Sequence, residues 1–356
     1  MSRKILFLIL IAAILVNFLG ALAPEIGFDA LWYHLTIPKL YELAGKIYHI
    51  PGGLFYYSEM PRLTEILYLF IHPQLLSWFF GIAVVYLLYW YTKSTLASVI
   101  WYVTPLVGWL SSSAYIDLPR TFFEFLAFIL IFNYPVLAGI VIGLAISTKT
   151  LALGSLLPLL ILVKKRRLFL VSCILVIFPW FFASYLNTGF PFYPIGAGIL
   201  DSTHVPTFNF TDFYKLWLAP QDFISPIYLL ILPFIFSKQH LKLKIYVLLT
   251  AIIWFVTPKT GGGRFILPYL PVWAILAATV ISRRRILLFA VIFVSTINLA
   301  YRFAAVSKTV PYLLGKESKQ SYLCHNLDLE STYYQCPAKE SKGQHNLYYY
   351  YTDFYK

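Results

Sequence analysis

The sequence predicts an all-α polytopic membrane protein with a bundle of about eleven transmembrane helices. Of its 356 residues, 60% are hydrophobic and only 12% are charged, whereas a soluble domain is about 45–50% apolar and about 25% charged. The mean hydropathy is +0.72. A chain this long and this apolar cannot enclose its hydrophobic residues in one soluble core, so we expect its helices to lie in lipid.

The first predicted span is residues 5–22, an uncharged apolar run that follows Arg3 and Lys4. A signal peptide is the rival interpretation, because residues 21–23 resemble a cleavage site. The run is longer than a signal core of about 7–15 residues, and Pro24 follows it directly, so we favour a retained helix. The other predicted spans cover residues 74–92, 95–111, 119–133, 135–148, 150–163, 168–186, 223–237, 245–257, 265–281 and 286–301.

Lys149 separates two of these spans, residues 135–148 and 150–163. One continuous helix would put Lys149 near the middle of the bilayer with no evident partner, which is costly. It would also put the basic run 164–167 on the opposite side of the membrane from the other basic clusters. We therefore predict two short helices that meet at Lys149.

The chain has 28 Lys and Arg against 15 Asp and Glu, a net charge of +13. In a soluble protein this excess would suggest nucleic acid. With a cytoplasmic N-terminus, the loops on that side instead carry 13 basic residues and no acidic one, as the positive-inside rule requires. These are Arg3, Lys4, Lys93, Lys164, Lys165, Arg166, Arg167, Lys238, Lys242, Lys244, Arg283, Arg284 and Arg285. We predict a multi-pass protein of the plasma (inner) membrane with an extracytoplasmic C-terminus, membrane lipid as a partner and no nucleic acid.

The three cysteines exclude a disulfide-rich scaffold. Cys324 and Cys336 both fall in the predicted outer tail, on the oxidising side, where a disulfide and two free thiols both fit. Cys173 is expected to be a buried small hydrophobe. We divide the chain into a transmembrane domain, its two large outer loops and the outer tail, which cover residues 1–301, 23–63, 187–222 and 302–356, respectively.

The first outer loop contains a candidate general base, Asp29, a few residues beyond the first span. A carboxylate at the membrane surface can accept a proton from a hydroxyl group. Tyr33 and His34 follow at i+4 and i+5, so Tyr33 would share a helical face with Asp29. The alternative is that Asp29 only caps a helix that begins at Ala30, and the local sequence fits both.

A second acidic motif opens the span at 119–133. Asp117, Arg120 and Glu124 are three and four residues apart, so on a helix they share one face. Asp117 lies at the span end and is a candidate site residue. Glu124 lies deeper, so we expect it to face the protein interior and to pair with Arg120.

Two cations complete the candidate site. Lys149 lies at the outer junction of two spans, and Arg264 follows three glycines at 261–263. Glycines let backbone approach a ligand closely, and Arg binds phosphate oxygens bidentately. The alternative is a flexible turn with Arg264 extended to lipid headgroups. Carboxylates with cations on one membrane face suit a reaction in which an acceptor is activated and a phosphate departs.

In chain order, several motifs resemble those of bacterial membrane glycosyltransferases of the GT-C type, family 39, the relatives of protein O-mannosyltransferases and aminoarabinose transferases. The motifs are Asp29 with Tyr33-His34, Pro61–Glu65, Tyr115–Pro119, Gly143–Lys149, Gly189–Pro194 and Arg264–Pro271. Phe190 stands where the family has Asn. The resemblance implies a GT-C-like bundle with its active site in outer loops that contain interfacial helices.

The resemblance also implies transfer of a sugar from a polyprenyl-phosphate donor to a glycan, lipid or protein acceptor. In this interpretation Asp29 is the base, Asp117 is a second acidic residue of the catalytic site, and Lys149 and Arg264 bind the donor phosphate. The expected substrate-binding residues are Tyr33, His34, Glu59, Arg120 and Tyr193.

The metal requirement is left open by the sequence. The family often has two acidic residues in succession in the first loop, but residue 30 is Ala here. Glu59 or Glu65 would have to supply a second carboxylate. A divalent metal fits the chemistry, yet no ligand set is evident, and no other cofactor is expected.

Two other functions compete. A transporter or flippase of lipid-linked saccharides needs polar residues through the bilayer centre, and the sequence has few there. A scaffold protein predicts that Asp29, Lys149 and Arg264 do not converge.

Overall fold

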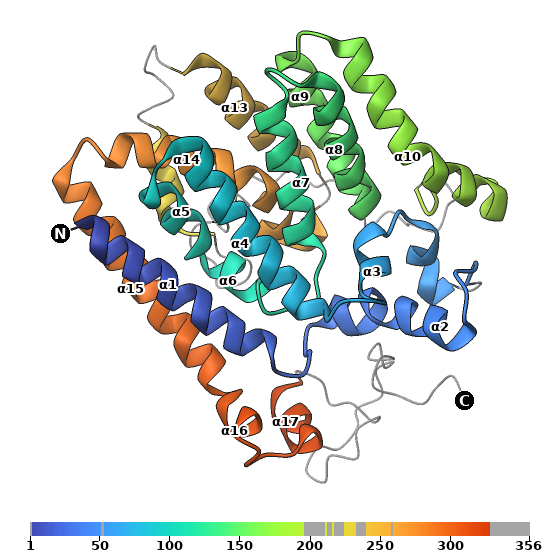
Figure 1. The fold of residues 1–356 in the computed structure, drawn as a ribbon, viewed down its shortest axis with the longest axis horizontal. Helices are drawn as coiled ribbons and strands as arrows, with labels where there is room; N and C mark the ends of the chain where they lie inside the picture. Colours follow the sequence, from blue (N-terminus) through green and yellow to red (C-terminus); the bar gives the residue numbers. More distant parts are fainter. Residues whose placement is uncertain are drawn as a thin grey trace.

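The computed structural model describes residues 2–50, 53–195, 211, 216, 224–232, 240–257 and 259–327, and the regular structure in these ranges is all helical (Figure 1). Four of the described helices are long and apolar enough to cross a membrane: α1 (Ser2–Ala21), α4 (Pro73–Thr92), α10 (Arg166–Thr188) and α15 (Arg285–Ser307). The predicted all-α membrane class is confirmed, whereas the count of about eleven spans is not.

The remaining elements are shorter than a straight span. They are η1 (Ala30–His34), α2 (Thr36–Ala44), η2 (Gly53–Glu59), α3 (Leu63–Leu67), α5 (Thr95–Tyr102), α6 (Pro105–Leu110), α7 (Asp117–Leu130), α8 (Pro135–Thr148), η3 (Thr150–Ser155), α9 (Leu156–Leu162), η5 (Pro226–Ile231), α13 (Leu241–Val256), η6 (Lys259–Phe265), η7 (Leu267–Tyr269), α14 (Leu270–Ile281), α16 (Val310–Leu313) and α17 (Lys319–Asn326). Several predicted spans are therefore realised as two or three short helices in succession.

The core forms around α14, whose apolar residues are almost all buried. It packs against α4, α5, α13 and η5. The long helices α1 and α15 run side by side along the edge of the bundle (Figure 1). On α15, residues such as Ile286 and Phe293 are exposed, which is the pattern expected of a helix that faces lipid.

The break predicted at Lys149 is present. Helix α8 ends at Thr148, Lys149 is extended with φ −151° and ψ 119°, and the next turn begins at Thr150. A continuous helix there is excluded, so the Lys149 side chain extends from a junction between two elements.

Helices α8 and α10 approach closely because α8 presents two glycines one turn apart. A Cβ added at Gly139 would collide with Ser172 and with the carbonyl oxygen of Phe169, and one at Gly143 would lie 2.7 Å from the Cβ of Val176. Small residues at this spacing let two helical backbones pack tightly within a membrane.

We expect Gly143→Ala to lower the thermal stability of the detergent-solubilised protein. Alanine is the better helix former by about 1 kcal/mol, but overpacking costs roughly 1–3 kcal/mol. The matched control is Val136→Ala on the exposed side of the same helix, which should change little. An unchanged or higher melting temperature for Gly143→Ala would mean that α8 and α10 are not in this contact.

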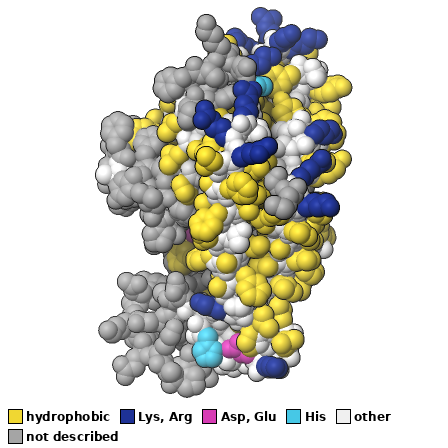
Figure 2. Space-filling view, turned by 90° about the vertical axis from the view of Figure 1, so that its left-hand side faces the viewer, with side chains coloured by type: hydrophobic (Ala, Val, Ile, Leu, Met, Phe, Trp, Pro, Cys, Tyr) yellow, Lys and Arg dark blue, Asp and Glu magenta, His cyan; other side chains and the backbone are white. Residues whose placement is uncertain are grey.

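Charge is distributed unevenly over the surface. Figure 2 shows most of the visible Lys and Arg side chains toward one end, a broad hydrophobic band next to them, and acidic side chains, with a His and further basic side chains, at the other end. Of the 13 basic residues assigned to the cytoplasm, those that the structure describes are exposed or partly exposed. This matches a protein whose apolar middle lies in lipid. The orientation of the termini stays a prediction.

Some predictions fall largely outside the described residues. These are most of the outer loop 187–222, much of the span 223–237 and the end of the outer tail. Helix α15 continues to Ser307, beyond the predicted boundary at residue 301. Cys173 is free and buried, as expected, and Cys324 is disulfide-bonded. Cys336 lies outside the described ranges.

Candidate active site

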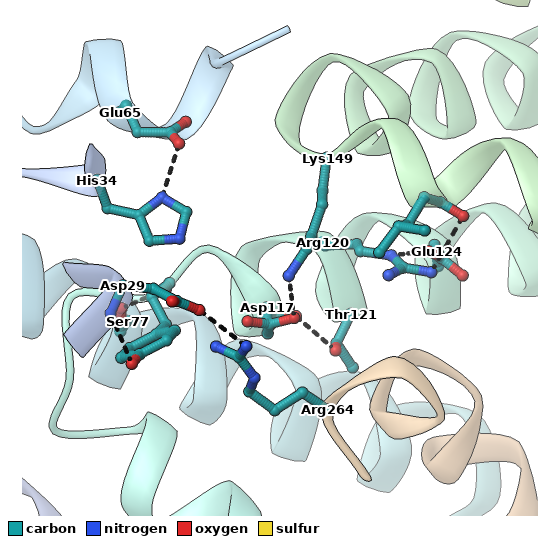
Figure 3. A network of polar contacts seen from close by, with 12 residues as sticks. Asp29, His34, Glu65, Ser77, Asp117, Arg120, Thr121, Glu124, Lys149 and Arg264 are labelled. Carbon is teal, nitrogen blue, oxygen red and sulfur yellow. Dashed lines mark hydrogen bonds and ion pairs between the residues drawn. The ribbon is translucent and has the colours of Figure 1, made fainter. Parts of the chain in front are cut away.

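Four charged side chains from four separate segments converge in two ion pairs (Figure 3). Arg264 Nη2 lies 2.8 Å from Asp29 Oδ2, and Lys149 Nζ lies 2.8 Å from Asp117 Oδ1. The Asp117 side chain is fully buried, whereas the other three are 14–20% exposed. We call these four residues the charge cluster.

Arg264 joins the two halves of the charge cluster. Its guanidinium lies between the carboxylates of Asp29 and Asp117 (Figure 3) and 4.9 Å from the centroid of the Tyr115 ring, a favourable cation–π distance. Burial by itself lowers the pKa of Arg264, but Asp117 and then Asp29 raise it above its usual range. The side chain is therefore a permanent cation held between two carboxylates.

Lys149 is held by the junction between α8 and η3. Its ammonium donates to Asp117 and lies 5.6 Å from the centroid of Phe265, the residue after Arg264. In the part of the chain that is described, Asp117 Oδ2 is buried and accepts no hydrogen bond. The charge cluster contains two cations and two carboxylates and is neutral overall. Pairing each charge with an opposite one offsets part of the cost of desolvating the four side chains.

Asp29 occupies the N-cap position of η1, but its side chain makes no capping hydrogen bond. The Asp29 carboxylate instead forms the ion pair with Arg264, and the Asp29 backbone N–H donates to Tyr115 Oη at 3.3 Å. The Asp29 side chain therefore does not act as a helix cap, and its role as a site residue stays a prediction.

Glu25 anchors the loop that carries Asp29. Its carboxylate accepts from the backbone N–H groups of Ile26 at 2.9 Å and Gly27 at 2.7 Å, and from that of Ala114. Ala114 lies just before Tyr115 and Asp117. Glu25 therefore links the loop that carries Asp29 to the segment that carries Asp117. The sequence does not indicate this role of Glu25, because these three bonds go to backbone N–H groups, which every residue except proline carries.

Tyr33 and His34 lie beside the charge cluster. The Tyr33 ring stacks on Tyr57 with centroids 4.0 Å apart, and burial followed by the Asp29 charge raises the pKa of its hydroxyl well above the usual value. His34 is buried, and its Nδ1 lies 2.8 Å from Glu65 Oε1. Its Nε2 has no hydrogen-bond partner among the described residues.

Glu59 and Tyr193 belong to a neighbouring part of the outer loops. Glu59 lies 2.5 Å from His49 Nδ1 and accepts from Asn187 Nδ2 at 3.0 Å. Burial and then the Glu59 charge raise the pKa of Tyr193. These two residues are near each other, but neither is bonded to the charge cluster.

Arg120 pairs with Glu124, as the i,i+4 spacing predicted, with Arg120 Nε 2.5 Å from Glu124 Oε1. The pair lies one turn deeper in α7 than Asp117, and Arg120 points toward Glu124 (Figure 3). A substrate contact by Arg120 stays a prediction.

No group of three or more His, Cys, Asp or Glu side chains that could hold a metal ion occurs within the described ranges. The two carboxylates considered for this purpose, Glu59 and Glu65, are each next to one histidine, His49 and His34, respectively. The metal requirement therefore stays open.

Two crystal structures of ArnT from Cupriavidus metallidurans have a similar fold. The one bound to undecaprenyl phosphate has a TM-score of 0.59 at 15% sequence identity. The apo structure has a TM-score of 0.54 at 16% identity. Each alignment covers 88% of this chain and 66% of the ArnT chain.

This chain has an ArnT-like fold. ArnT is a GT-C family 39 aminoarabinose transferase, so the resemblance inferred from the ordered motifs is confirmed at the level of the fold. No protein-family model matches the sequence, and a search of curated proteins finds no significant match. The convergence of Asp29, Lys149 and Arg264 runs against the scaffold alternative, which predicted that these residues lie apart.

The buried Glu25 predicts a pH dependence. Burial raises its pKa from 4.5 to about 7, despite its three backbone donors. The folded state then binds this proton more tightly than the unfolded state, so the stability contribution is fully present below pH 4.5 and is lost as pH rises through about 7. At about 1.4 kcal/mol per pKa unit, the loss is about 3 kcal/mol.

The measurement is the thermal unfolding midpoint between pH 5 and pH 8 for the wild type and for Glu25→Gln, which does not titrate. We expect the wild-type midpoint to fall over this range and that of Glu25→Gln to fall less. Parallel curves for the two proteins would contradict the assignment.

Proposed function

We propose that this protein is a membrane glycosyltransferase that moves a sugar from a polyprenyl-phosphate donor to an acceptor hydroxyl on the outer face of the membrane. The observation that carries the proposal is the charge cluster, in which two carboxylates and two cations meet close to the ends of helices. The outer face follows from the orientation predicted from the basic residues. An ArnT-like fold supports the proposal, because one of the similar ArnT structures holds undecaprenyl phosphate.

In the proposed reaction, Lys149 and Arg264 bind the donor phosphate. Both side chains are partly exposed, and the guanidinium of Arg264 offers the planar pair of donors that phosphate oxygens accept. Arg264 is already bound to Asp29, so the phosphate competes with that carboxylate. When the phosphate binds Arg264, the Asp29 carboxylate is released from its ion pair and can accept a hydrogen bond from the acceptor hydroxyl.

Asp29 then accepts the proton of the acceptor hydroxyl as that oxygen attacks the anomeric carbon of the sugar. A new carbon–oxygen bond forms on the acceptor. The bond between the anomeric carbon and the phosphate oxygen breaks, and its electron pair leaves with the polyprenyl phosphate, whose charge Lys149 and Arg264 stabilise. Attack from the face opposite the phosphate inverts the anomeric centre.

Asp117 has a supporting role in this mechanism. It is fully buried and bonded to Lys149, and its charge also acts on Arg264. It therefore holds the two phosphate-binding cations in place. Tyr33 and His34, and the more distant Glu59 and Tyr193, are the candidates for sugar and acceptor contacts, since aromatic rings and carboxylates suit saccharide hydroxyl groups.

The test of the base is Asp29→Asn, assayed for transfer from a labelled polyprenyl-phosphate sugar. Because general-base catalysis contributes roughly 10²–10⁴-fold, kcat should fall by that factor while the donor still binds. Glu42→Gln, in the same outer loop but on an exposed position of α2, serves as the control and should keep full activity. Undiminished transfer by Asp29→Asn would remove Asp29 from the mechanism.

The test of the phosphate contacts is Arg264→Gln and Lys149→Met, with titration of the donor. Loss of one charge that stabilises the departing phosphate costs roughly 10²–10³-fold in rate, and the KM for the donor should rise as well. The KM for the acceptor should stay close to its wild-type value. A change confined to the acceptor KM would assign these cations to the other substrate.

A further inference from the structure

A buried polar network lies directly behind the charge cluster and is not used by the proposed chemistry. Glu124 Oε1 is 2.5 Å from Arg120 Nε, and Glu124 Oε2 accepts from Ser155 Oγ. Ser155 Oγ also lies 3.4 Å from Tyr269 Oη. Arg120 Nη2 donates to the carbonyl oxygen of Leu151 at 3.4 Å. All four side chains are buried.

The network joins the three segments that carry three members of the charge cluster. Arg120 and Glu124 belong to α7, which begins at Asp117. Leu151 and Ser155 belong to η3, which begins at the residue after Lys149. Tyr269 belongs to η7, shortly after Arg264 in the chain.

The contact with η3 matters most, because Lys149 is the residue at which α8 ends, and only its N–H still donates into that helix, to the carbonyl oxygen of Ala145. The Lys149 backbone is extended, and η3 has no side-chain cap at its start. Within the described contacts, two polar bonds tie the two ends of η3 to α7, from Leu151 to Arg120 and from Ser155 to Glu124. They add to the local backbone bonds of Lys149, which run from its N–H to the carbonyl oxygen of Ala145 and from the N–H of Ala152 to its own carbonyl oxygen. The local bonds join Lys149 to its chain neighbours, whereas the two bonds to α7 fix η3 against another helix.

Stability is a poor explanation for such a network. Replacing a buried ion pair by apolar residues of similar volume is often neutral or stabilising, because both charges are desolvated. A charged pair with bonds to defined oxygen atoms does, however, specify one relative position of the segments that it joins.

We propose that Arg120 and Glu124 are positioning residues that act through Ser155 and Leu151 to hold Lys149, and through Tyr269 to hold the segment of Arg264, at the donor phosphate. The inference rests on the proposed function. In this proposal, Arg120 and Glu124 both hold the phosphate-binding cations in position and do not contact the substrate themselves.

The first test variant is Ser155→Ala, which cuts the bond between Glu124 and η3 but leaves the ion pair intact. Misplacing a catalytic group by about 1 Å costs on the order of 10²-fold, so we expect the donor KM to rise roughly 10- to 100-fold, with an unchanged acceptor KM. The matched control is Ser98→Ala in α5, a buried serine whose hydroxyl lies within hydrogen-bond distance of the Val85 and Ser94 carbonyl oxygens. It should leave both values unchanged.

The second variant, Arg120→Met combined with Glu124→Leu, separates positioning from stability. Because apolar side chains replace both charges, the melting temperature of the double variant should be close to that of the wild type. Glu124→Gln alone leaves Arg120 charged without its carboxylate partner, so this single variant should have a lower melting temperature. A positioning role predicts that the stable double variant still has the raised donor KM. Wild-type donor KM in the double variant would overturn the proposal.

A third readout does not depend on activity. Hydrogen exchange of the backbone amides of residues 149–156, followed by mass spectrometry, should accelerate in Ser155→Ala and in the double variant but not in Ser98→Ala. Unchanged exchange would show that the network does not hold η3 and would also overturn the proposal. If the wild type transfers no sugar but exchange responds as expected, the proposed function fails and the restraint on Lys149 stands.

Discussion

The constraint on which the structure depends is the cost of burying charge. Asp117 and Glu124 are fully buried, and an unpaired carboxylate there would be strongly destabilising. Each is neutralised by a cation, Lys149 or Arg120, and Arg264 extends the arrangement to Asp29. Arg120 and Glu124 lie on the same helix, but Lys149 and Asp117, and likewise Arg264 and Asp29, come from separate segments. Neutralising these last two carboxylates therefore also fixes where the segments meet. The same interactions that permit burial therefore bring together the groups to which we assign the proposed transfer reaction.

This constraint accounts for the irregular backbone around the site. Lys149 interrupts what would otherwise be one apolar helix, and Arg264 follows a glycine-rich turn in which Gly262 has φ 51°. Non-helical backbone at membrane depth is tolerated where it is enclosed by protein or lines a cavity. Because the backbone is not helical at these two breaks, the side chains of Lys149 and Arg264 can point in directions that a regular helix would not allow. The network of Arg120, Glu124 and Ser155 holds the segment that follows the break at Lys149.

The sequence predicted features that depend on residues close together in the chain, and features that follow from burial in a lipid bilayer. The apolar composition indicated the fold class, the charge at Lys149 indicated a helix break, and the i,i+4 spacing indicated the pair of Arg120 with Glu124. It did not predict which cation pairs with Asp29 or Asp117, because those partners are distant in the chain. It also missed Glu25 and Ser155, whose roles depend on single hydrogen bonds across segments. The count of about eleven spans is not confirmed, because several of the predicted apolar segments consist of two or three short helices, and hydropathy does not register such breaks.

The most direct test of this account is a cryo-electron microscopy structure of the full chain with undecaprenyl phosphate bound. The account predicts that the phosphate lies within hydrogen-bond distance of both Lys149 and Arg264, and that Arg264 has moved from Asp29 to the phosphate. A phosphate bound elsewhere, with the contact of 2.8 Å between Asp29 and Arg264 retained, would contradict it.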